Sequence, residues 1–283
     1  MNKTFILTND PDHGNLSRLK NVFNALNYHD ILVTTAVFCT MEKDDSGLST
    51  HCYRGETGAL DEPDYRDFML EQRDKGHEIA FHGYSQISNP REKFIEGLEI
   101  YKEIFGEYPF TYMEHGGMKG HHPDRDCKKE RLDWLGADKN TQYYIEDVIK
   151  DKIKCTWAYF DLLDGPELWQ KNPNERGSES NLVPKTTEDL FYQKNDILFF
   201  KRWRTHYLEK MYHQLQCAKF CTFIGYTHFG YDAYAERGVI HDDWRTEKSC
   251  FKSAETLKRM IEDFNMDSKT IKQIVRSELK NEA

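Results

Sequence analysis

Acidic and imidazole side chains recur where the predicted strands of this chain end. The residues at these strand ends are Asp10, Asp12, His82, Glu114, His115 and His228. Carboxylate and imidazole groups bind zinc-like ions, and they also move protons during hydrolysis. If the strands are parallel, their carboxyl ends share one face of the fold. The sequence therefore predicts a metal-assisted hydrolase with a separate proton acceptor and proton donor.

The first two of these residues have a plainer explanation as well. Asp10 and Asp12 are two apart, so an extended backbone points both to the same side, separated by about 7 Å. An Asp-Pro-Asp segment is also an ordinary turn after a strand, because Asp and Pro favour turns. His82 also has a plainer explanation, because a strand can simply end in a histidine that has no function.

The elements that must position these residues follow from hydrophobic periodicity. Residues 4–10 and 31–38 are apolar or β-branched, and residues 15–29 between them have apolar residues at helical spacing. Further strands are expected at 77–82, 110–115, 155–163, 196–203 and 220–230, separated by helices such as 90–106. Apolar strands that alternate with helices predict a parallel sheet covered on both faces.

The expected organisation is one α/β domain over residues 1–283. About seven strands, with no internal repeat, favour a barrel-like arrangement. A long loop is expected at about 40–63, and a helical tail at about 250–283.

The sequence around the strand ends resembles that of a known family. In order along the chain, the segments "LTNDPD", "GHEIAFHGYSQ", "GEYPFTYMEHGG" and "FIGYTHFG" are similar to motifs of the polysaccharide deacetylases with the NodB homology fold, carbohydrate esterase family 4. The resemblance covers most of residues 1–230. It implies a distorted (β/α)7 barrel and metal-dependent hydrolysis of an N-acyl group on a sugar.

The resemblance also implies roles for individual residues. Asp10 would be the general base and His228 the general acid, while Asp12 and His82 would be metal ligands. Gln86 stands where the family has its second metal-binding histidine.

A second departure concerns the arginine that pairs with the base aspartate in the family. Its position here is Tyr112 or Met113. Without it, Asp10 loses a positive neighbour that would keep it ionised. His115 or Arg125 could take over that role.

The glutamine changes the expected metal chemistry. An amide oxygen is a weaker zinc donor than imidazole, so a site built from Asp12, His82 and Gln86 should bind zinc less tightly or prefer a harder ion. Glu114 and His115, at the next strand end, are the candidates to complete the ligand set. The expected cofactor is a divalent ion, with zinc first.

The aromatic segments "WAYF" and "KRWR" suggest a sugar-binding groove. Its candidate residues are Trp157, Tyr159, Trp203 and Arg204, because aromatic faces stack on sugar rings. The alternative is that these residues only pack the core.

Charge and hydropathy restrict the partners. The net charge is -9, which gives no general attraction for nucleic acid. No run approaches the roughly 18 apolar residues of a spanning helix, and the apolar start is too short for a signal peptide. A cytoplasmic location is therefore expected, and with it an amino-sugar-containing intermediate of surface polysaccharide or lipopolysaccharide biosynthesis as substrate.

Two alternatives to this function stay open. The first is a metal-free protein of the deacetylase fold that binds a saccharide or a partner without turnover. The second is hydrolysis of another C–N bond, such as a formamide or a cyclic ureide.

Overall fold

The chain is described by a computed structural model that covers residues 3–10, 14–41, 58–85, 87–114, 129–132, 134–157, 186–204, 208–217, 222–229, 244 and 246–278. Its strands are β1 (Lys3–Asn9), β2 (Val33–Phe38), β3 (Glu78–Gly83), β4 (Thr111–Met113), β5 (Cys155–Trp157), β6 (Phe191–Lys194), β7 (Ile197–Phe200), β8 (Trp203–Arg204), β9 (Phe223–Thr227) and β10 (Met266–Lys269). Its α-helices are α1 (Leu16–Tyr28), α2 (Pro63–Asp74), α3 (Arg91–Phe105), α4 (Glu146–Lys152), α6 (Leu208–Cys217), α7 (Glu247–Asp263) and α8 (Ile271–Glu278).

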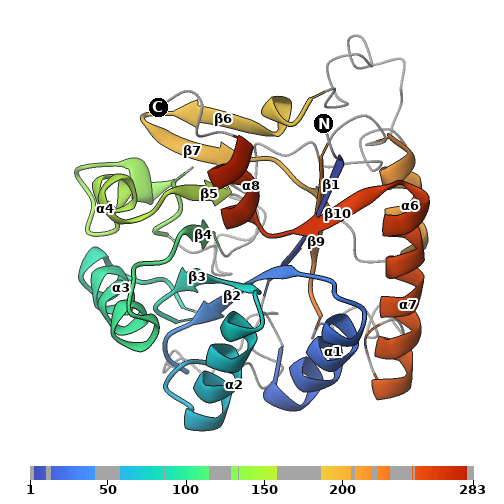
Figure 1. Ribbon diagram of the computed structural model, residues 1–283. Helices are drawn as coiled ribbons and strands as arrows, with labels where there is room; N and C mark the ends of the chain where they lie inside the picture. Colours follow the sequence, from blue (N-terminus) through green and yellow to red (C-terminus); the bar gives the residue numbers. More distant parts are fainter. Residues whose placement is uncertain are drawn as a thin grey trace, which may run out of the picture.

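These strands form one curled sheet (Figure 1). Their order is β6-β7-β5-β4-β3-β2-β1-β9-β8, with β10 added beside β1. Every pair is parallel except β6 with β7. The predicted α/β fold with a distorted barrel is therefore confirmed.

One chain segment joins two strands that lie far apart in this strand order. Residues 196–203 were expected to form a single strand, but the structure divides the segment into two. β7 pairs with β5 at Phe199, and β8 pairs with β9 at Trp203 and Arg204. Since only Lys201 and Arg202 lie between β7 and β8, the sheet curls round on itself.

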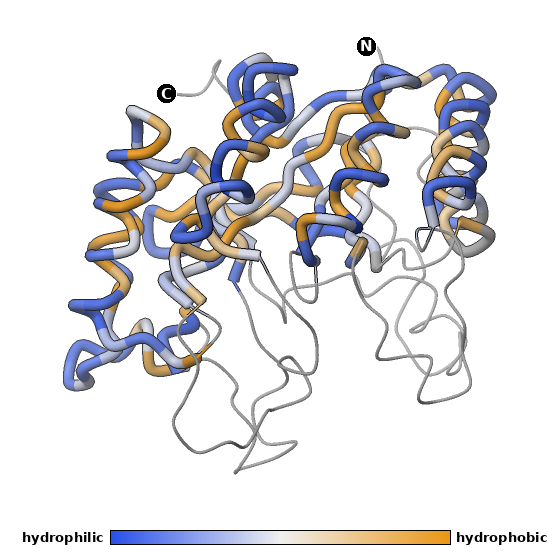
Figure 2. The backbone as a smooth tube through the Cα atoms, turned by 90° about the horizontal axis from the view of Figure 1, so that it is seen from below, coloured by the Kyte–Doolittle hydropathy of each residue, from blue (hydrophilic) through white to orange (hydrophobic). Residues whose placement is uncertain are grey.

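The helices cover the outside of the sheet, as their amphipathic sequences predict. Helix α1 starts at Asn15, whose side chain accepts a hydrogen bond from the Arg18 amide at 3.0 Å, and it buries Leu19, Val22 and Phe23. Helix α3 stops at Gly106, whose φ of 78° suits glycine. Figure 2 shows the resulting alternation of hydrophilic and hydrophobic residues along the helices.

The C-terminal tail differs from the expected helix. Between α7 and α8 lies β10, which pairs with Lys3–Ile6 of β1, while β2 pairs with the later residues Leu7–Asn9. The segment "MDSK" has no apolar pattern, so only its pairing with β1 makes it a strand. Strand β10 and helix α8 together lie across the end of the barrel where the strands begin. We call this unit the C-terminal plug.

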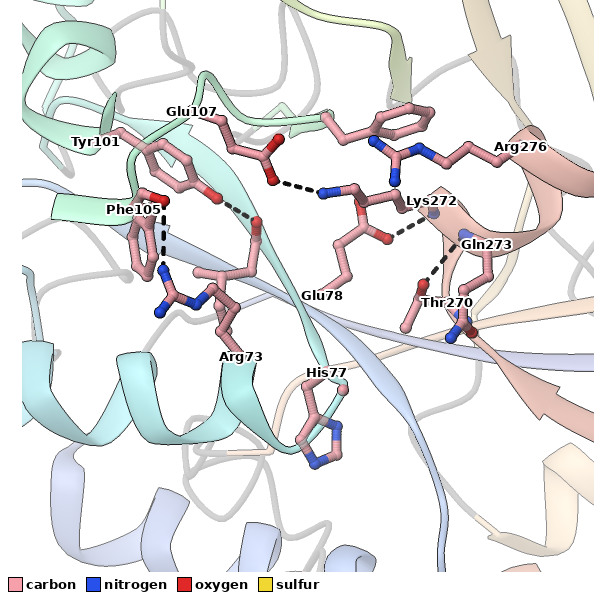
Figure 3. Close-up of a pocket in the computed structure, with 13 residues that line it drawn as sticks. Arg73, His77, Glu78, Tyr101, Phe105, Glu107, Thr270, Lys272, Gln273 and Arg276 are labelled. Atoms are coloured by element: carbon pink, nitrogen blue, oxygen red, sulfur yellow. Dashed lines mark hydrogen bonds and ion pairs between the residues drawn. The ribbon is translucent and has the colours of Figure 1, made fainter. Parts of the chain in front are cut away.

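A cavity of about 260 Å³ lies between the plug and the barrel (Figure 3). Its lining includes Glu78, Tyr101, Glu107, Lys272 and Arg276. Its polar groups are bonded to one another: the Lys272 ammonium contacts Glu107 at 2.6 Å, and the Tyr101 hydroxyl donates to the Ile79 carbonyl at 2.5 Å.

Two remaining expectations concern the loop and the membrane. Most of the loop expected at about 40–63 lies outside the described residues, which resume at Gly58. Within the described ranges, no helix combines the length and the apolar character that crossing a bilayer would require.

Candidate active site

Asp10 and His228 lie side by side because β1 and β9 are neighbours. The two strands run parallel with Asn9 opposite Thr227, and the Asp10 amide donates to the Thr227 carbonyl at 3.0 Å. The Asn9 side chain accepts from the Phe229 amide at 3.0 Å, which holds the turn after β9 against β1. Asp10 and His228, which follow these two strands, therefore lie close together.

His82 reaches this place through an irregularity in β3. Val37 of β2 pairs with Phe81, but the next residue, Phe38, pairs with Gly83, so His82 is an extra residue in its strand. Gly83 has a φ of 120°, which favours glycine. Bulges of this kind redirect a side chain and are common beside active sites.

The two nitrogens of His82 have different neighbours. Nδ1 lies 2.5 Å from the Met113 carbonyl oxygen, which can only accept, so Nδ1 carries a proton. Nε2 lies 3.1 Å from Oδ1 of Asp10. A neutral ring would turn a lone pair toward the carboxylate lone pairs, so this contact is favourable when a proton or a cation lies between the two atoms.

His228 approaches Asp10 from the opposite side. Its Nδ1 lies 3.6 Å from the same oxygen, Oδ1, that faces His82. Its Nε2 contacts the hydroxyl of Tyr226. That hydroxyl is also 3.4 Å from Oδ2 of Asp10. Asp10 is 5% exposed, so these contacts are made away from bulk water.

Tyr226 was not among the residues predicted for the site. Its signal in the sequence is its position two residues before His228, because residues i and i+2 of a strand face the same side. What the sequence could not show is that its hydroxyl reaches both Asp10 and His228.

A buried arginine lies behind Tyr226. The Arg202 guanidinium is 3.4 Å from the ring centre of Trp157 and 3.9 Å from that of Tyr226, and the residue is 1% exposed. It comes from the link between β7 and β8, where the sequence pointed only to Trp203 and Arg204. The ring of Tyr226 therefore lies between the Arg202 cation and Asp10. The predicted replacements for the family's arginine, His115 and Arg125, lie outside the described residues.

The metal ligands predicted from sequence are only partly described. Asp12, Gln86 and His115 lie outside the described residues. In the part of the chain that is described, no three His, Cys, Asp or Glu side chains gather as a metal site. His82 nevertheless has the arrangement of a zinc-binding histidine, in which one ring nitrogen donates to a backbone carbonyl and the other faces the site.

Glu114, predicted as a substitute ligand, is tied to the backbone. Its Oε1 accepts a hydrogen bond from the Leu132 amide at 2.7 Å, and the residue is buried. Its carbonyl accepts from the Trp157 indole nitrogen at 3.0 Å. The second bond joins the last residue of β5 to the residue that follows β4.

Two of the predicted sugar-binding aromatics, Trp157 and Trp203, do not lie at the surface. Trp157 is fully buried, and Trp203 is 2% exposed and stacks on Phe223 with ring centres 5.1 Å apart. Neither indole has a free face, so their placement corrects the prediction of a groove: they pack the barrel instead. Arg204 is the last residue of β8, and Tyr159 lies outside the described residues.

Comparisons with known proteins give similarity in structure only. No protein-family model and no curated protein matches the chain. The polysaccharide deacetylase Bc1974 from Bacillus cereus is 11% identical, with a TM-score of 0.45, over 95% of this chain and 91% of that one.

Two other solved structures are similar to the same degree. The peptidoglycan deacetylase PdaC from Bacillus subtilis is 12% identical, with a TM-score of 0.46, over 100% of this chain and 94% of that one. The Puue allantoinase is 12% identical, with a TM-score of 0.47, over 96% and 88%.

Proposed function

We propose that this chain is a metal-dependent N-deacylase that hydrolyses an amide on an amino-sugar-containing intermediate of surface polysaccharide or lipopolysaccharide synthesis. The observation that carries this proposal is the position of the Asp10 carboxylate between Nε2 of His82 and Nδ1 of His228. One buried carboxylate between two imidazoles can both accept and stabilise a proton, as amide hydrolysis requires.

Asp10 and His228 take the two proton-transfer roles. Asp10 accepts the proton of the attacking water, since it is the carboxylate at the centre of the cluster. His228 delivers a proton to the departing amine, because an amine leaves readily only when protonated. Their contact at 3.6 Å lets the positive imidazole form beside a negative carboxylate, which stabilises it.

The proposed metal ligands are His82, Asp12 and Gln86, with His115 and Glu114 as possible additions. The Met113 carbonyl fixes the proton of His82 on Nδ1 and leaves Nε2 to face the site. When bound, a divalent ion such as zinc supplies a Lewis acid for the amide carbonyl and activates water.

Metal content tests the ligand assignment without a substrate. Protein purified without a polyhistidine tag should carry about one divalent ion per chain by elemental mass spectrometry. His82→Ala and Asp12→Ala should lose the ion, while His29→Ala, at the end of α1, should keep it. Less than a tenth of an ion per chain after incubation with zinc would contradict metal dependence.

Substrate class is tested by measuring released acid. N-acetylated amino sugars should release acetate, whereas simple formamides and cyclic ureides should not. Release from the small amides alone would favour the other C–N hydrolase. If sugars bind by calorimetry and release no acid, the chain is a saccharide-binding protein of this fold.

A further inference from the structure

The cavity between the C-terminal plug and the barrel lies at the end of the fold where the strands begin, away from Asp10 (Figure 3). Its volume of about 260 Å³ is slightly below the roughly 300–1,000 Å³ of ordinary ligand pockets, so it suits a small molecule. Helix α2, the link between α3 and β4, and helix α8 all contribute to its lining. A molecule bound there would therefore contact the plug and the barrel at once.

Two arginines lie over aromatic rings in this cavity. The Arg276 guanidinium of α8 is 5.4 Å from the centre of the Phe110 ring, and the Arg73 guanidinium of α2 is 5.8 Å from the centre of the Phe105 ring. A guanidinium that lies on an aromatic face still presents its N–H groups at its edge, where they can bind a carboxylate. The cavity therefore combines apolar ring surface with cationic donors, as a site for an organic anion requires.

Arg276 is the cation best placed to receive an anion. Within the part of the chain that the structure describes, its guanidinium has no carboxylate partner, whereas Arg73 bonds to Asp74 at 2.8 Å. Lys272 precedes Arg276 by four residues on α8, so both lie on one face of the helix. The Lys272 ammonium has three hydrogens, and its contact with Glu107 at 2.6 Å uses one of them. A carboxylate can therefore bind between Lys272 and Arg276.

Both acidic residues of the cavity already have donors. The Glu78 carboxylate accepts from the Lys272 amide at 2.7 Å, and Glu107 contacts the Lys272 ammonium. The cavity is lined by three Lys or Arg side chains against these two carboxylates, and His77 is neutral at pH 7 because burial lowers its pKa to about 4. The lining therefore carries one net positive charge. This charge matches a monoanion better than a metal cation or a phosphate, which carries nearly two negative charges.

We propose that this cavity is a second binding site, separate from the candidate active site, for a small monocarboxylate with an apolar or aromatic body. The carboxylate accepts hydrogen bonds from Arg276 and Lys272, and the body packs on the rings of Phe110 and Phe105. Because the bound molecule joins α8 to the barrel, it stabilises the docked plug. The site does not depend on amide hydrolysis at the other end of the barrel.

Benzoate is the first probe, because it joins one carboxylate to one aromatic ring. Calorimetry with the full chain should give a Kd of about 1 mM or tighter. Benzamide has the ring without the charge, and inorganic phosphate has charge without an apolar body, so each should bind at least about tenfold more weakly. No binding at about 10 mM benzoate, or equal binding of either control compound, would overturn the proposal.

Substitutions test where benzoate binds. Arg276→Gln should weaken benzoate binding by about 10- to 100-fold, because it removes a charge-assisted, bidentate donor. The matched control is Arg259→Gln on α7, where the arginine contacts Glu255 at the surface, and it should keep the wild-type affinity. Asp10→Asn should keep it as well. If Asp10→Asn lost the binding and Arg276→Gln kept it, benzoate would occupy the candidate active site and the proposal would be wrong.

Hydrogen exchange gives a second, independent readout of the same site. Benzoate should slow exchange at the amides of α8, because the ligand holds this helix against the barrel. The effect should be absent in Arg276→Gln and with benzamide. Protection confined to the ends of β1 and β9 would place benzoate beside Asp10 and His228 instead, and it would overturn the proposal.

Discussion

The two ends of strand β3 carry similar side chains in opposite circumstances. At its beginning, His77 and Glu78 are buried, and Glu78 bonds to the C-terminal plug; at its end, His82 faces Asp10. Glu78 lies in the regular part of the strand, whereas the bulge at His82 redirects that side chain toward Asp10. The two ends therefore differ in backbone geometry as well as in surroundings.

The groups at the beginning of β3 have partners that do not titrate near neutral pH. Glu78 accepts from the Thr111 hydroxyl at 2.5 Å, from the Thr34 hydroxyl at 3.0 Å and from the Lys272 amide at 2.7 Å. Burial raises the pKa of its carboxyl, and these bonds partly oppose that effect. Such a carboxylate holds α8 in place.

His77 is satisfied in the same way. Its Nδ1 accepts from the Val33 amide at 3.1 Å, and its Nε2 donates to Oδ1 of Asn27 at 2.8 Å. Burial, helped by the charge of Lys75, lowers its pKa to about 4. At the other end, the partners of Asp10 are histidines and a tyrosine. Burial alone therefore does not identify a reactive group. A reactive group also needs partners that can donate or accept protons.

The largest effect should come from Asp10, which faces His82 near the end of β3. Asp10→Asn keeps the size of the side chain but cannot accept a proton, so hydrolysis of the amide substrate should fall by about 100- to 10,000-fold. Initial rates measure this, and circular dichroism checks the fold. Activity within threefold of the wild type would show that Asp10 is not the general base.

The next effect is the acid sensitivity of His77. Because its folded pKa of about 4 lies below the unfolded value of 6.5, the unfolded chain binds more protons between these values. The contribution of neutral His77 to the free energy of unfolding is therefore present above pH 6.5. It is lost as the pH falls toward 4, and the loss is as much as about 3 kcal/mol.

Urea unfolding at several pH values measures this loss. His77→Gln does not titrate, so the difference in stability between it and the wild type should shrink as the pH falls. A difference that stays constant from pH 7 to pH 4 would mean that His77 is not held neutral in the fold.

A third effect is expected from Glu78→Ala. It leaves the Lys272 amide and two hydroxyls without their acceptor, which should cost about 2 kcal/mol of folding free energy. Hydrogen exchange should speed up first at the amides of α8. Glu78→Gln, which keeps one acceptor oxygen, should lose less than half as much. If the alanine variant were as stable as the glutamine variant, the carboxylate would not hold the plug.

The smallest effect concerns the ion pair of Lys272 and Glu107 at the cavity. The nitrogen–oxygen distance is 2.6 Å, but 60% of the Glu107 side chain is exposed. A double-mutant cycle with alanine should give a coupling of about 0.2–1 kcal/mol, which 1 M salt should largely remove. A coupling that salt does not reduce would indicate a buried pair instead.

The sequence predicted the local features of the site well. Periodicity located β1, β3 and β9, and therefore placed Asp10, His82 and His228 at strand ends. These signals are local, because a strand or an amphipathic helix repeats its pattern within a few residues. The roles given to Asp12 and Gln86 remain predictions, since both lie outside the described residues.

Other features could not be read in this way. Strand β10 is polar and exists through its pairing with Lys3–Ile6. The two tryptophans were expected at a groove, but closing of the sheet buries them. Arg202 reaches Tyr226 because the link between β7 and β8 crosses from β5 to β9.

By itself, the sequence determined that Asp10, His82 and His228 lie at or near the ends of strands of an α/β fold. The tertiary structure decided which of these residues meet: Asp10 with His82 and His228, and Tyr226 with both Asp10 and His228. The reason is geometric. Periodicity fixes the face to which a side chain points, whereas the partner opposite it depends on how the sheet curls, on the bulge at His82 and on the register between strands distant in the chain.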